Sequence, residues 1–454
     1  MRMSTASDSR HHEPTPKPRP KPRTATARRA LGLAVSVPVA TAMLIGQGTA
    51  FAAEKPVGAS AAAAYRALDS ADDQIATNLD TRSQDPRLAG STLSGIVVDA
   101  GSGQQVWDHD AATTLMPASN MKLATTTAVL TVLGPDHRFT TKAVYGGGTL
   151  TLVGGGDRVL TTADLTTLAN TAVACLKNAG ITSVKVQVDD SLFPEPTLAT
   201  GWNPDYYDGA TIAPVRALVV DEHSVMDTSI DAGQVFAKQL AAKGLTVTGD
   251  VTRGKTTGSD VPVAVHRSPT LSAIVKQMLK KSDNDIAETL LRMTALGAGR
   301  PATFDDGAAV VRHVLSDVYG IGLENFQDYD GSGLSRSDRL SARTIADILK
   351  VDSDPGYSWL LQPIMDGLPV AGEAGSTLGP EWDRFTTPES KCAVGKVMAK
   401  TGTLTGAIAL SGLTKGQDGR WKIFSFVENN ATTPNIDVKH TFDGLAATVN
   451  GCWT

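Results

Sequence analysis

Three short motifs occur in a fixed order along this chain and constrain its fold more than any other feature. They are Ser119-Asn-Met-Lys122, Ser282-Asp-Asn284 and Lys400-Thr-Gly-Thr403, and the patterns Ser-x-x-Lys, Ser-x-Asn and Lys-Thr-Gly each occur once. Together they supply two serine hydroxyls and two lysine amines, the groups needed to acylate a serine with an amide or lactam. A fold that uses them must bring three distant stretches of chain to one place.

The first motif opens an apolar helix that we expect from about Ser119 to Leu133, with Gly134 as its stop. A serine there is ordinarily an N-cap. Lys122 adds a functional interpretation, because residues i and i+3 share one helical face and the amine can reach the hydroxyl. Such a lysine must be desolvated or lie beside another cation to act as a base, and Lys400 is the natural neighbour. The amide of Ser119 is a candidate oxyanion donor.

The other two motifs also have ordinary interpretations, as a helix cap and as a strand end. In the functional interpretation, Ser282 relays a proton to the leaving amine and Asn284 bonds the substrate amide or Lys122. Lys400, Thr401 and the Thr403 hydroxyl bind a terminal carboxylate. Gly402 lets substrate pair along the strand edge, and the backbone N–H of Thr403 is the second oxyanion donor.

The first 53 residues differ from the rest of the chain. A Pro-, Arg- and Lys-rich stretch covers residues 1–29, and an apolar run from Ala30 to Ala50 ends in the small-x-small site Ala50-Phe-Ala52. This is the pattern of a secretory signal peptide. An uncleaved membrane anchor is the alternative, because about 20 residues can span a bilayer. We expect an exported product without a stable membrane span after cleavage.

Composition excludes several other classes of protein. Residues 1–53 hold 8 of the 42 basic and 2 of the 47 acidic residues, so the remaining chain has a net charge near −11. That charge argues against a nucleic-acid partner. The eight histidines lack metal-ligand spacing and no Cys-x-x-Cys occurs, so we expect no metal and no cofactor. Cys392 and Cys452 could pair in an oxidising compartment, whereas Cys175 is expected to be a buried free thiol.

Hydrophobic patterning predicts an α/β (α+β) protein whose main sheet is built from both chain ends. Five strands are expected, followed by a closing helix over about 436–449, and a further helix is expected over 56–80. The strands are 93–98, 105–107, 396–401, 407–413 and 421–427. They fit one antiparallel sheet covered by helices. We therefore predict a catalytic domain from residues 54–142 and 262–454.

The middle of the chain predicts an inserted α+β domain over residues 143–261. It holds short β runs, separated by Gly-rich turns, and two helices near 162–179 and 232–243. The β runs are 143–145, 149–153, 184–188 and 245–251. The acidic pair Asp189-Asp190 could meet a side-chain amine of a substrate, although an exposed strand end is the simpler interpretation. From residue 268 the pattern becomes helical.

Taken together, the three motifs are the signature of penicillin-binding proteins and serine β-lactamases. More narrowly, the chain resembles the low-molecular-mass class C penicillin-binding proteins, which are serine D-alanyl-D-alanine carboxypeptidases/endopeptidases. The resemblance extends over roughly residues 60–450 and includes Pro117–Leu123, Lys281–Glu288, Asp330–Arg336 and Lys400–Gly406. The 163 residues between Ser119 and Ser282 leave room for an insertion that simple β-lactamases lack.

The resemblance implies a transpeptidase/β-lactamase-like fold and hydrolysis of the D-Ala–D-Ala bond of peptidoglycan stem peptides, with β-lactam antibiotics as inhibitors. It implies that Ser119 forms the acyl-enzyme, Lys122 accepts its proton and Ser282 passes a proton to the leaving D-Ala. We assign the Asp330-Gly-Ser-Gly segment no chemical role. The implied location is secreted and cell-wall associated.

Two rival functions stay open. A β-lactamase would need a group that activates deacylating water, such as Glu-x-x-Leu-Asn or a Tyr-x-Asn in place of Ser-x-Asn, and the sequence has neither. A non-catalytic cell-wall binding or sensing protein could share the fold. The sequence leaves undecided the balance of carboxypeptidase, endopeptidase and transpeptidase activity, the third stem residue and the oligomeric state.

Overall fold

The computed structural model describes residues 59–208 and 211–453, and the signal peptide predicted over residues 1–53 lies outside them. The strands are β1 Thr92–Asp99, β2 Gln105–His109, β3 Thr114–Leu115, β4 Thr140–Gly146, β5 Thr149–Val153, β6 Ser183–Asp189, β7 Thr246–Val247, β8 Thr252–Arg253, β9 Val261–Arg267, β10 Leu340–Ser341, β11 Met398–Leu404, β12 Ala407–Lys415 and β13 Trp421–Asn429. The helices are α1 Ala59–Arg82, α2 Met121–Leu133, α3 Thr162–Asn178, α4 Asp205–Asp208, α5 Thr228–Ala242, α6 Leu271–Lys281, α7 Asn284–Gly297, α8 Phe304–His313, α9 Ala342–Asp352, α10 Ser358–Gly367 and α11 Asn435–Val449. No helix of this described part is long and apolar enough to cross a bilayer.

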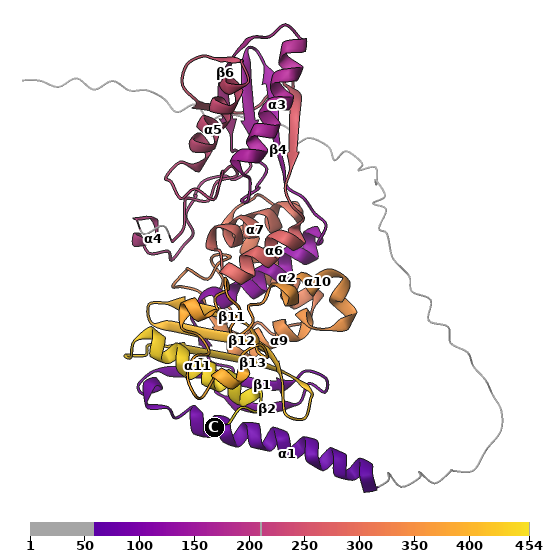
Figure 1. Ribbon diagram of the computed structural model, residues 1–454, viewed down its shortest axis with the longest axis vertical. Helices are drawn as coiled ribbons and strands as arrows, with labels where there is room; N and C mark the ends of the chain where they lie inside the picture. The colour runs from indigo at the N-terminus through magenta and orange to yellow at the C-terminus, as the bar shows by residue number, and fades with distance from the viewer. Residues whose placement is uncertain (1–58, 209–210, 454) are drawn as a thin grey trace, which may run out of the picture. The chain divides into compact units, whose positions relative to one another are not determined.

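The main sheet has five strands in the order β11-β12-β13-β1-β2, and every pair is antiparallel (Figure 1). The prediction of one sheet built from both chain ends is confirmed. β1 and β2 come from the N-terminal part of the chain, and β11 to β13 come from the C-terminal part. β11 lies at an edge, so one side of the strand that carries the third motif pairs with no other strand of this sheet.

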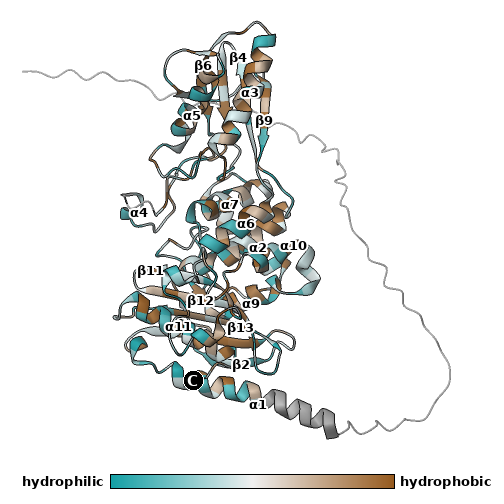
Figure 2. Cartoon of the chain, viewed as in Figure 1, coloured by the Kyte–Doolittle hydropathy of each residue, from teal (hydrophilic) through white to brown (hydrophobic). Residues whose placement is uncertain are grey.

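Both faces of this sheet are buried, and alternate residues of each strand face opposite sides. In β13, Phe424 and Phe426 pack in a cluster with α1 and α11, whereas Ile423 and Val427 pack in a second cluster with α2 and α9. β12 and β13 are accordingly apolar along most of their length (Figure 2). Helices therefore cover both faces, as the sequence predicted.

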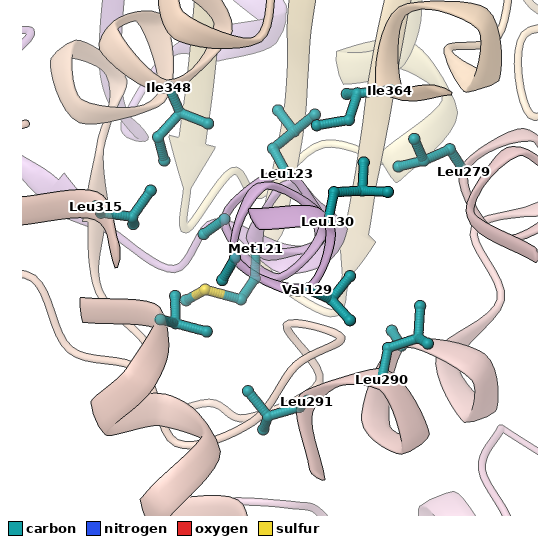
Figure 3. Packing of buried hydrophobic residues seen from close by; sticks show 14 of the residues in the cluster. Met121, Leu123, Val129, Leu130, Leu279, Leu290, Leu291, Leu315, Ile348 and Ile364 are labelled. Carbon is teal, nitrogen blue, oxygen red and sulfur yellow. The ribbon is translucent and has the colours of Figure 1, made fainter. Parts of the chain in front are cut away.

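Helix α2 lies at the centre of the second cluster. Its residues 121–130 are all buried, and leucines and isoleucines from neighbouring helices surround it (Figure 3). A helix that is apolar all round is typical of a core position. Lys122 is the one charged residue of α2, so its side chain begins inside the core.

The segment predicted as an insertion has a hydrophobic cluster of its own, drawn from residues 143–264. A mixed sheet in the order β7-β6-β5-β4-β9 packs there with α3 and α5. Because β4 and β9 extend across the predicted limits at 143 and 261, those limits stay a prediction.

Two details of this segment differ from the sequence prediction. The strand expected over 245–251 is limited to the two residues of β7, because Gly249 turns the chain with a positive φ of 73°; β8 begins at residue 252, beyond the expected range. Strand β9 was not predicted because it contains Pro262, which cannot donate to a ladder. It is tolerated because β9 lies at the sheet edge.

The three cysteines are all free thiols. Cys175 is exposed, so the expectation of a buried thiol is wrong: it lies on the solvent side of α3, between the buried positions Ala172 and Leu176. Cys392 and Cys452 are half-buried neighbours. Burial, with the adjacent Cys392 thiol, raises the pKa of Cys452 to about 12.

A buried ionic cluster ties α1 to the sheet. The carboxylates of Asp72, Asp99 and Asp418 converge, and the ammonium of Lys422 lies 2.5, 2.9 and 3.0 Å from them in that order. Arg420 contacts the same three carboxylates. Lys422, itself fully buried, and Arg420 thus supply two positive charges to these three carboxylates.

We predict that Lys422→Met lowers the free energy of unfolding by about 3 kcal/mol, because it leaves buried carboxylates short of a cation. The measurement is guanidinium unfolding followed by circular dichroism. The control is Lys276→Met, which removes an exposed pair with Asp366 and should cost less than about 1 kcal/mol. Equal losses in the two variants would contradict this account of the cluster.

Candidate active site

The three motifs meet at one cleft of ≈ 480 Å³. Ser119 lies in the 3₁₀ turn η2 (Ala118–Asn120) that leads into α2. Ser282 lies in the turn between α6 and α7, and Thr401 lies on the edge strand β11. The cleft is lined by Ser119, Tyr206, Thr211, Lys281, Ser282, Asn284, Leu334, Thr377, Trp382, Arg384, Thr401, Thr403, Leu404, Thr405, Asn435 and Lys439.

The turn that carries Ser119 is held by close backbone contacts. Ala118 has a positive φ of 47°, which is uncommon for a residue with a side chain. A Cβ at Gly333 would lie 1.9 Å from the carbonyl oxygen of Ala118, and one at Gly402 would lie 2.9 Å from that of Pro117. Both positions need glycine because the serine turn approaches so closely. Gly402 thus makes room for the nucleophile turn, a reason beyond the strand-edge pairing that we predicted.

Lys122 makes three polar contacts through its amine. Nζ lies 3.0 Å from Ser119 Oγ, 2.8 Å from Asn284 Oδ1 and 2.8 Å from the carbonyl oxygen of Ser332. The last two atoms can only accept, whereas the hydroxyl can also donate. A neutral amine has two N–H groups and one lone pair, so these contacts suit an uncharged lysine that accepts the proton of Ser119.

Asn284 is fixed in the orientation that this arrangement needs. Its Nδ2 donates to the carbonyl oxygen of Thr211 at 3.0 Å, so Oδ1 is directed at Lys122. Asn284 is the first residue of α7, and Asp283 caps that helix by accepting from the N–H of Ile286. The sequence predicted both the cap and the contact with Lys122.

Burial brings the titration of Lys122 close to physiological pH, where a fraction of the amine is then neutral. The side chain of Lys122 is completely buried, and loss of water disfavours the ammonium more than nearby carboxylates stabilise it, so its pKa falls to about 8. The pKa of Lys400 is lowered well below its ordinary value by burial and by repulsion from Lys122. The two lysines are close enough to influence each other, as predicted.

Lys400 contacts the serine of the second motif, Ser282. Its Nζ lies 2.7 Å from Ser282 Oγ and donates to the carbonyl oxygen of Thr401 at 2.9 Å. Ser282 adopts the left-handed conformation, with φ 58°, at the C-cap of α6. This turn brings the hydroxyl to the lysine and to the cleft at once.

The threonines of the third motif lie in the cleft wall. Thr401 Oγ1 donates to Thr377 Oγ1 at 2.8 Å, and Thr403 is exposed to the cleft. Every predicted site residue is therefore at the cleft or directly behind it. Lys122 and Lys400 form its buried rear, because neither lines the cleft itself.

Sequence reasoning missed the support behind Lys122. The buried carboxylate of Glu288 accepts from the backbone N–H groups of Gly331 (2.9 Å) and Ser332 (2.8 Å). Asp330 accepts from the N–H groups of Gly333 (2.7 Å) and Ser335 (2.6 Å). These bonds hold the loop 330–335 whose carbonyl at Ser332 binds Lys122. The signal was present in the Asp-Gly-Ser-Gly segment, to which we assigned no role.

The Asp189-Asp190 pair does not reach the cleft. Both residues are buried, so the expectation of an exposed strand end is wrong. Asp189 accepts from the N–H and the hydroxyl of Thr256, and Asp190 pairs with Arg253. These internal partners satisfy the pair within the inserted segment.

Comparison with known proteins agrees with this geometry. The model of the D-Ala-D-Ala carboxypeptidase 3 (S13) family matches residues 75–226 and 222–449. A carboxypeptidase DacB of Mycolicibacterium smegmatis is 32% identical over 83% of this chain and 84% of its own length. A D-alanyl-D-alanine carboxypeptidase of Actinomadura is 28% identical over 80% and 82% of the two chains. Penicillin binding protein 4 of Haemophilus influenzae shares the fold, with a TM-score of 0.69 at 23% identity over 82% of this chain and 98% of its own.

Fold and cleft together define a serine hydrolase of the penicillin-binding class. The chain belongs to the D-Ala-D-Ala carboxypeptidase 3 (S13) family, which the class C resemblance anticipated. It is accordingly an enzyme, a serine-type D-Ala-D-Ala carboxypeptidase.

We predict that Glu288→Gln slows acylation by a penicillin about 10- to 100-fold while the protein stays folded. The amide would oppose one of the two N–H donors with its own NH₂ group and displace the Ser332 carbonyl from Lys122. Burial and the nearby Asp330 raise the pKa of Glu288 to about 8, so Glu288 and Lys122 titrate in the same range. In its ionised form the Glu288 carboxylate stabilises the ammonium of Lys122, so its loss should lower the pKa of Lys122 further. The rate rises with pH as that ammonium loses its proton, and the midpoint should therefore move from near 8 to a lower pH.

The measurement is the pH profile of the acylation rate, with the exposed Glu324→Gln as control. A loss of rate without a shift in the midpoint would reduce Glu288 to a purely structural role.

Proposed function

We propose that the protein is an exported serine D-Ala-D-Ala carboxypeptidase/endopeptidase that acts on peptidoglycan stem peptides through an acyl-enzyme on Ser119. The observation that carries the proposal is the 3.0 Å contact between Ser119 Oγ and the buried Lys122 Nζ, at the rear of an open cleft. This pairs a nucleophile with a base whose pKa burial has lowered to about 8.

In the proposed acylation, Ser119 Oγ attacks the carbonyl carbon of the penultimate D-Ala and gives its proton to Lys122 Nζ. The backbone N–H groups of Ser119 and Thr403 bind the oxyanion. The C–N bond then breaks, and the leaving amine takes a proton from Ser282, which Lys400 contacts at 2.7 Å. The proton held by Lys122 replaces the one that Ser282 has given up, so both groups return to their starting forms. Water attacks the ester in the second half of the reaction, releases the shortened peptide and restores the proton to Ser119.

The proposed substrate carboxylate binds at the Lys400-Thr-Gly-Thr403 strand. Thr401 and Thr403 present hydroxyls to the cleft, and Lys400 lies behind them. The terminal D-Ala carboxylate of a stem peptide, or the carboxylate of a β-lactam, would lie here. A solved structure of the H. influenzae protein is complexed with a β-lactam, which supports β-lactam binding by this chain.

Cleavage of cross-links and an extracytoplasmic location belong to the same proposal. An endopeptidase differs from a carboxypeptidase only in the amine that leaves, so one catalytic arrangement serves both. The location depends on the leader in residues 1–53, whose basic and apolar parts have the order of a signal peptide.

We predict that a fluorescent penicillin labels the wild-type protein and leaves Ser119→Ala unlabelled. The serine oxygen is the atom that bonds to the opened lactam, and alanine has no such atom. The measurement is in-gel fluorescence after denaturation, with Ser191→Ala as a folded control outside the cleft. Release of D-Ala from a stem pentapeptide should be lost in the same variant.

Two outcomes would overturn the proposal. Absence of label on the folded wild type would favour a non-catalytic binding protein. Rapid loss of label by hydrolysis, without D-Ala release from a pentapeptide, would favour a β-lactamase.

A further inference from the structure

The charged side chains that line the cleft all carry the same sign. Its lining includes three cationic side chains, Lys281, Arg384 and Lys439, and no carboxylate. A cleft lined by charges of one sign concentrates ligands of the other sign. The lining therefore favours an anionic ligand, although the protein as a whole is acidic.

Of these cations, Arg384 is already neutralised. Its guanidinium is buried and forms a bidentate pair with the buried carboxylate of Asp443, with Nε at 3.1 and 3.0 Å from the two oxygens. The N–H of Phe385 donates to the same carboxylate. Arg384 thus supports the wall, and its charge is not available to a ligand in full.

Lys439 is in the opposite situation. It lies in the first part of α11 and lines the cleft, and nothing in residues 59–208 or 211–453 pairs with its ammonium. Partial burial and repulsion from Arg384 lower its pKa. An anion in the cleft would offset both effects.

Trp382 supplies an apolar surface beside this cation. Its side chain lines the cleft and is 60% exposed, which leaves one of the largest apolar surfaces of the chain open at the cleft wall. Such a ring can pack on the backbone or the methylene groups of a peptide. Trp382 and Arg384 follow Thr377, whose hydroxyl accepts from Thr401 at 2.8 Å.

The position of Trp382 and Lys439 relative to Thr401 indicates which part of a bound substrate they would contact. In the proposed reaction the β11 motif holds the carboxylate of the leaving residue, and Thr401 of that motif contacts Thr377. The cleft residues that follow Thr377 in the chain, Trp382 and Arg384, are therefore the ones we assign to the leaving group. Tyr206, Thr211 and Leu334 also line the cleft, and hydrogen bonds link them to Asn284 and to one another.

We propose that Lys439 and Trp382 form a leaving-group subsite that selects peptides whose departing residue carries a second anionic group. The inference rests on the proposed function and specifies its substrate class. A single leaving D-Ala has one carboxylate, which Thr401 takes. The acceptor strand of a cross-link brings further carboxylates, and these are the groups that Lys439 would bind.

The test uses three N-acylated peptides that end in D-Ala-D-Ala, D-Ala-D-Glu or D-Ala-D-Gln. The last two leaving groups have nearly the same size and differ in charge. The wild type should cleave the D-Glu peptide with a kcat/KM about two- to fivefold above that of the D-Gln peptide, the gain expected for one partly screened ion pair. Added salt should reduce this ratio.

Variants of Lys439 then test whether this residue causes the preference for the D-Glu peptide over the D-Gln peptide. In Lys439→Gln the ratio should fall to about one, whereas Lys439→Arg, which keeps the charge, should retain it. Lys391→Gln removes an exposed lysine outside the cleft and should retain the wild-type ratio. Because each ratio is measured on one sample, it does not depend on the folded fraction. If Lys439→Gln does not fold, the wild-type ratio and its salt dependence decide.

The outcomes separate the subsite from the catalytic proposal. Release of D-Ala with a wild-type D-Glu to D-Gln ratio near one, or an undiminished ratio in Lys439→Gln, would overturn the subsite alone. Failure to cleave any of the three peptides would overturn the proposed function and the subsite with it.

Discussion

The structure depends on one interaction, the 3.0 Å contact between the fully buried amine of Lys122 and the hydroxyl of Ser119. Lys122 projects from a helix whose first ten residues are all buried, so its ammonium loses hydration that its partners replace only in part, and its pKa falls. The two carbonyl oxygens that accept from it leave the lone pair for Ser119. The packing of α2 and the proposed proton transfer therefore both determine the surroundings of one atom, Lys122 Nζ.

Much of the surrounding architecture serves to hold that nitrogen in place. Glu288 and Asp330, both buried, bind the backbone of loop 330–335 and so position the Ser332 carbonyl. Thr125 donates to the Gly331 carbonyl from the next turn of α2, which connects the same loop to the helix that carries the lysine. Trp202, from the segment 143–261, donates to Asp330 at 2.7 Å, so that segment also contributes to the support.

Sequence reasoning predicted the elements and the contacts between motifs better than it predicted their support. The five strands, α2 and the Lys122–Asn284 pair follow from periodicity and from motif chemistry. The role of loop 330–335 could not be predicted, because Asp-Gly-Ser-Gly has the composition of any tight turn and its partner Glu288 lies 43 positions away. The exposure of Cys175 and the burial of Asp189 likewise depend on packing that a one-dimensional pattern does not contain. Lys439 gave no local signal, because its place in the cleft wall depends on how α11 packs.

The most direct test of the account is the titration of Lys122 itself. Protein with ¹³C at lysine Cε would be followed by NMR across pH, and the Lys122 signal would be assigned by its disappearance in Lys122→Gln. The account predicts a pKa near 8 for this signal. A pKa near 10.4, the ordinary value for lysine, would show a hydrated ammonium that cannot take the proton of Ser119, and would contradict the central claim.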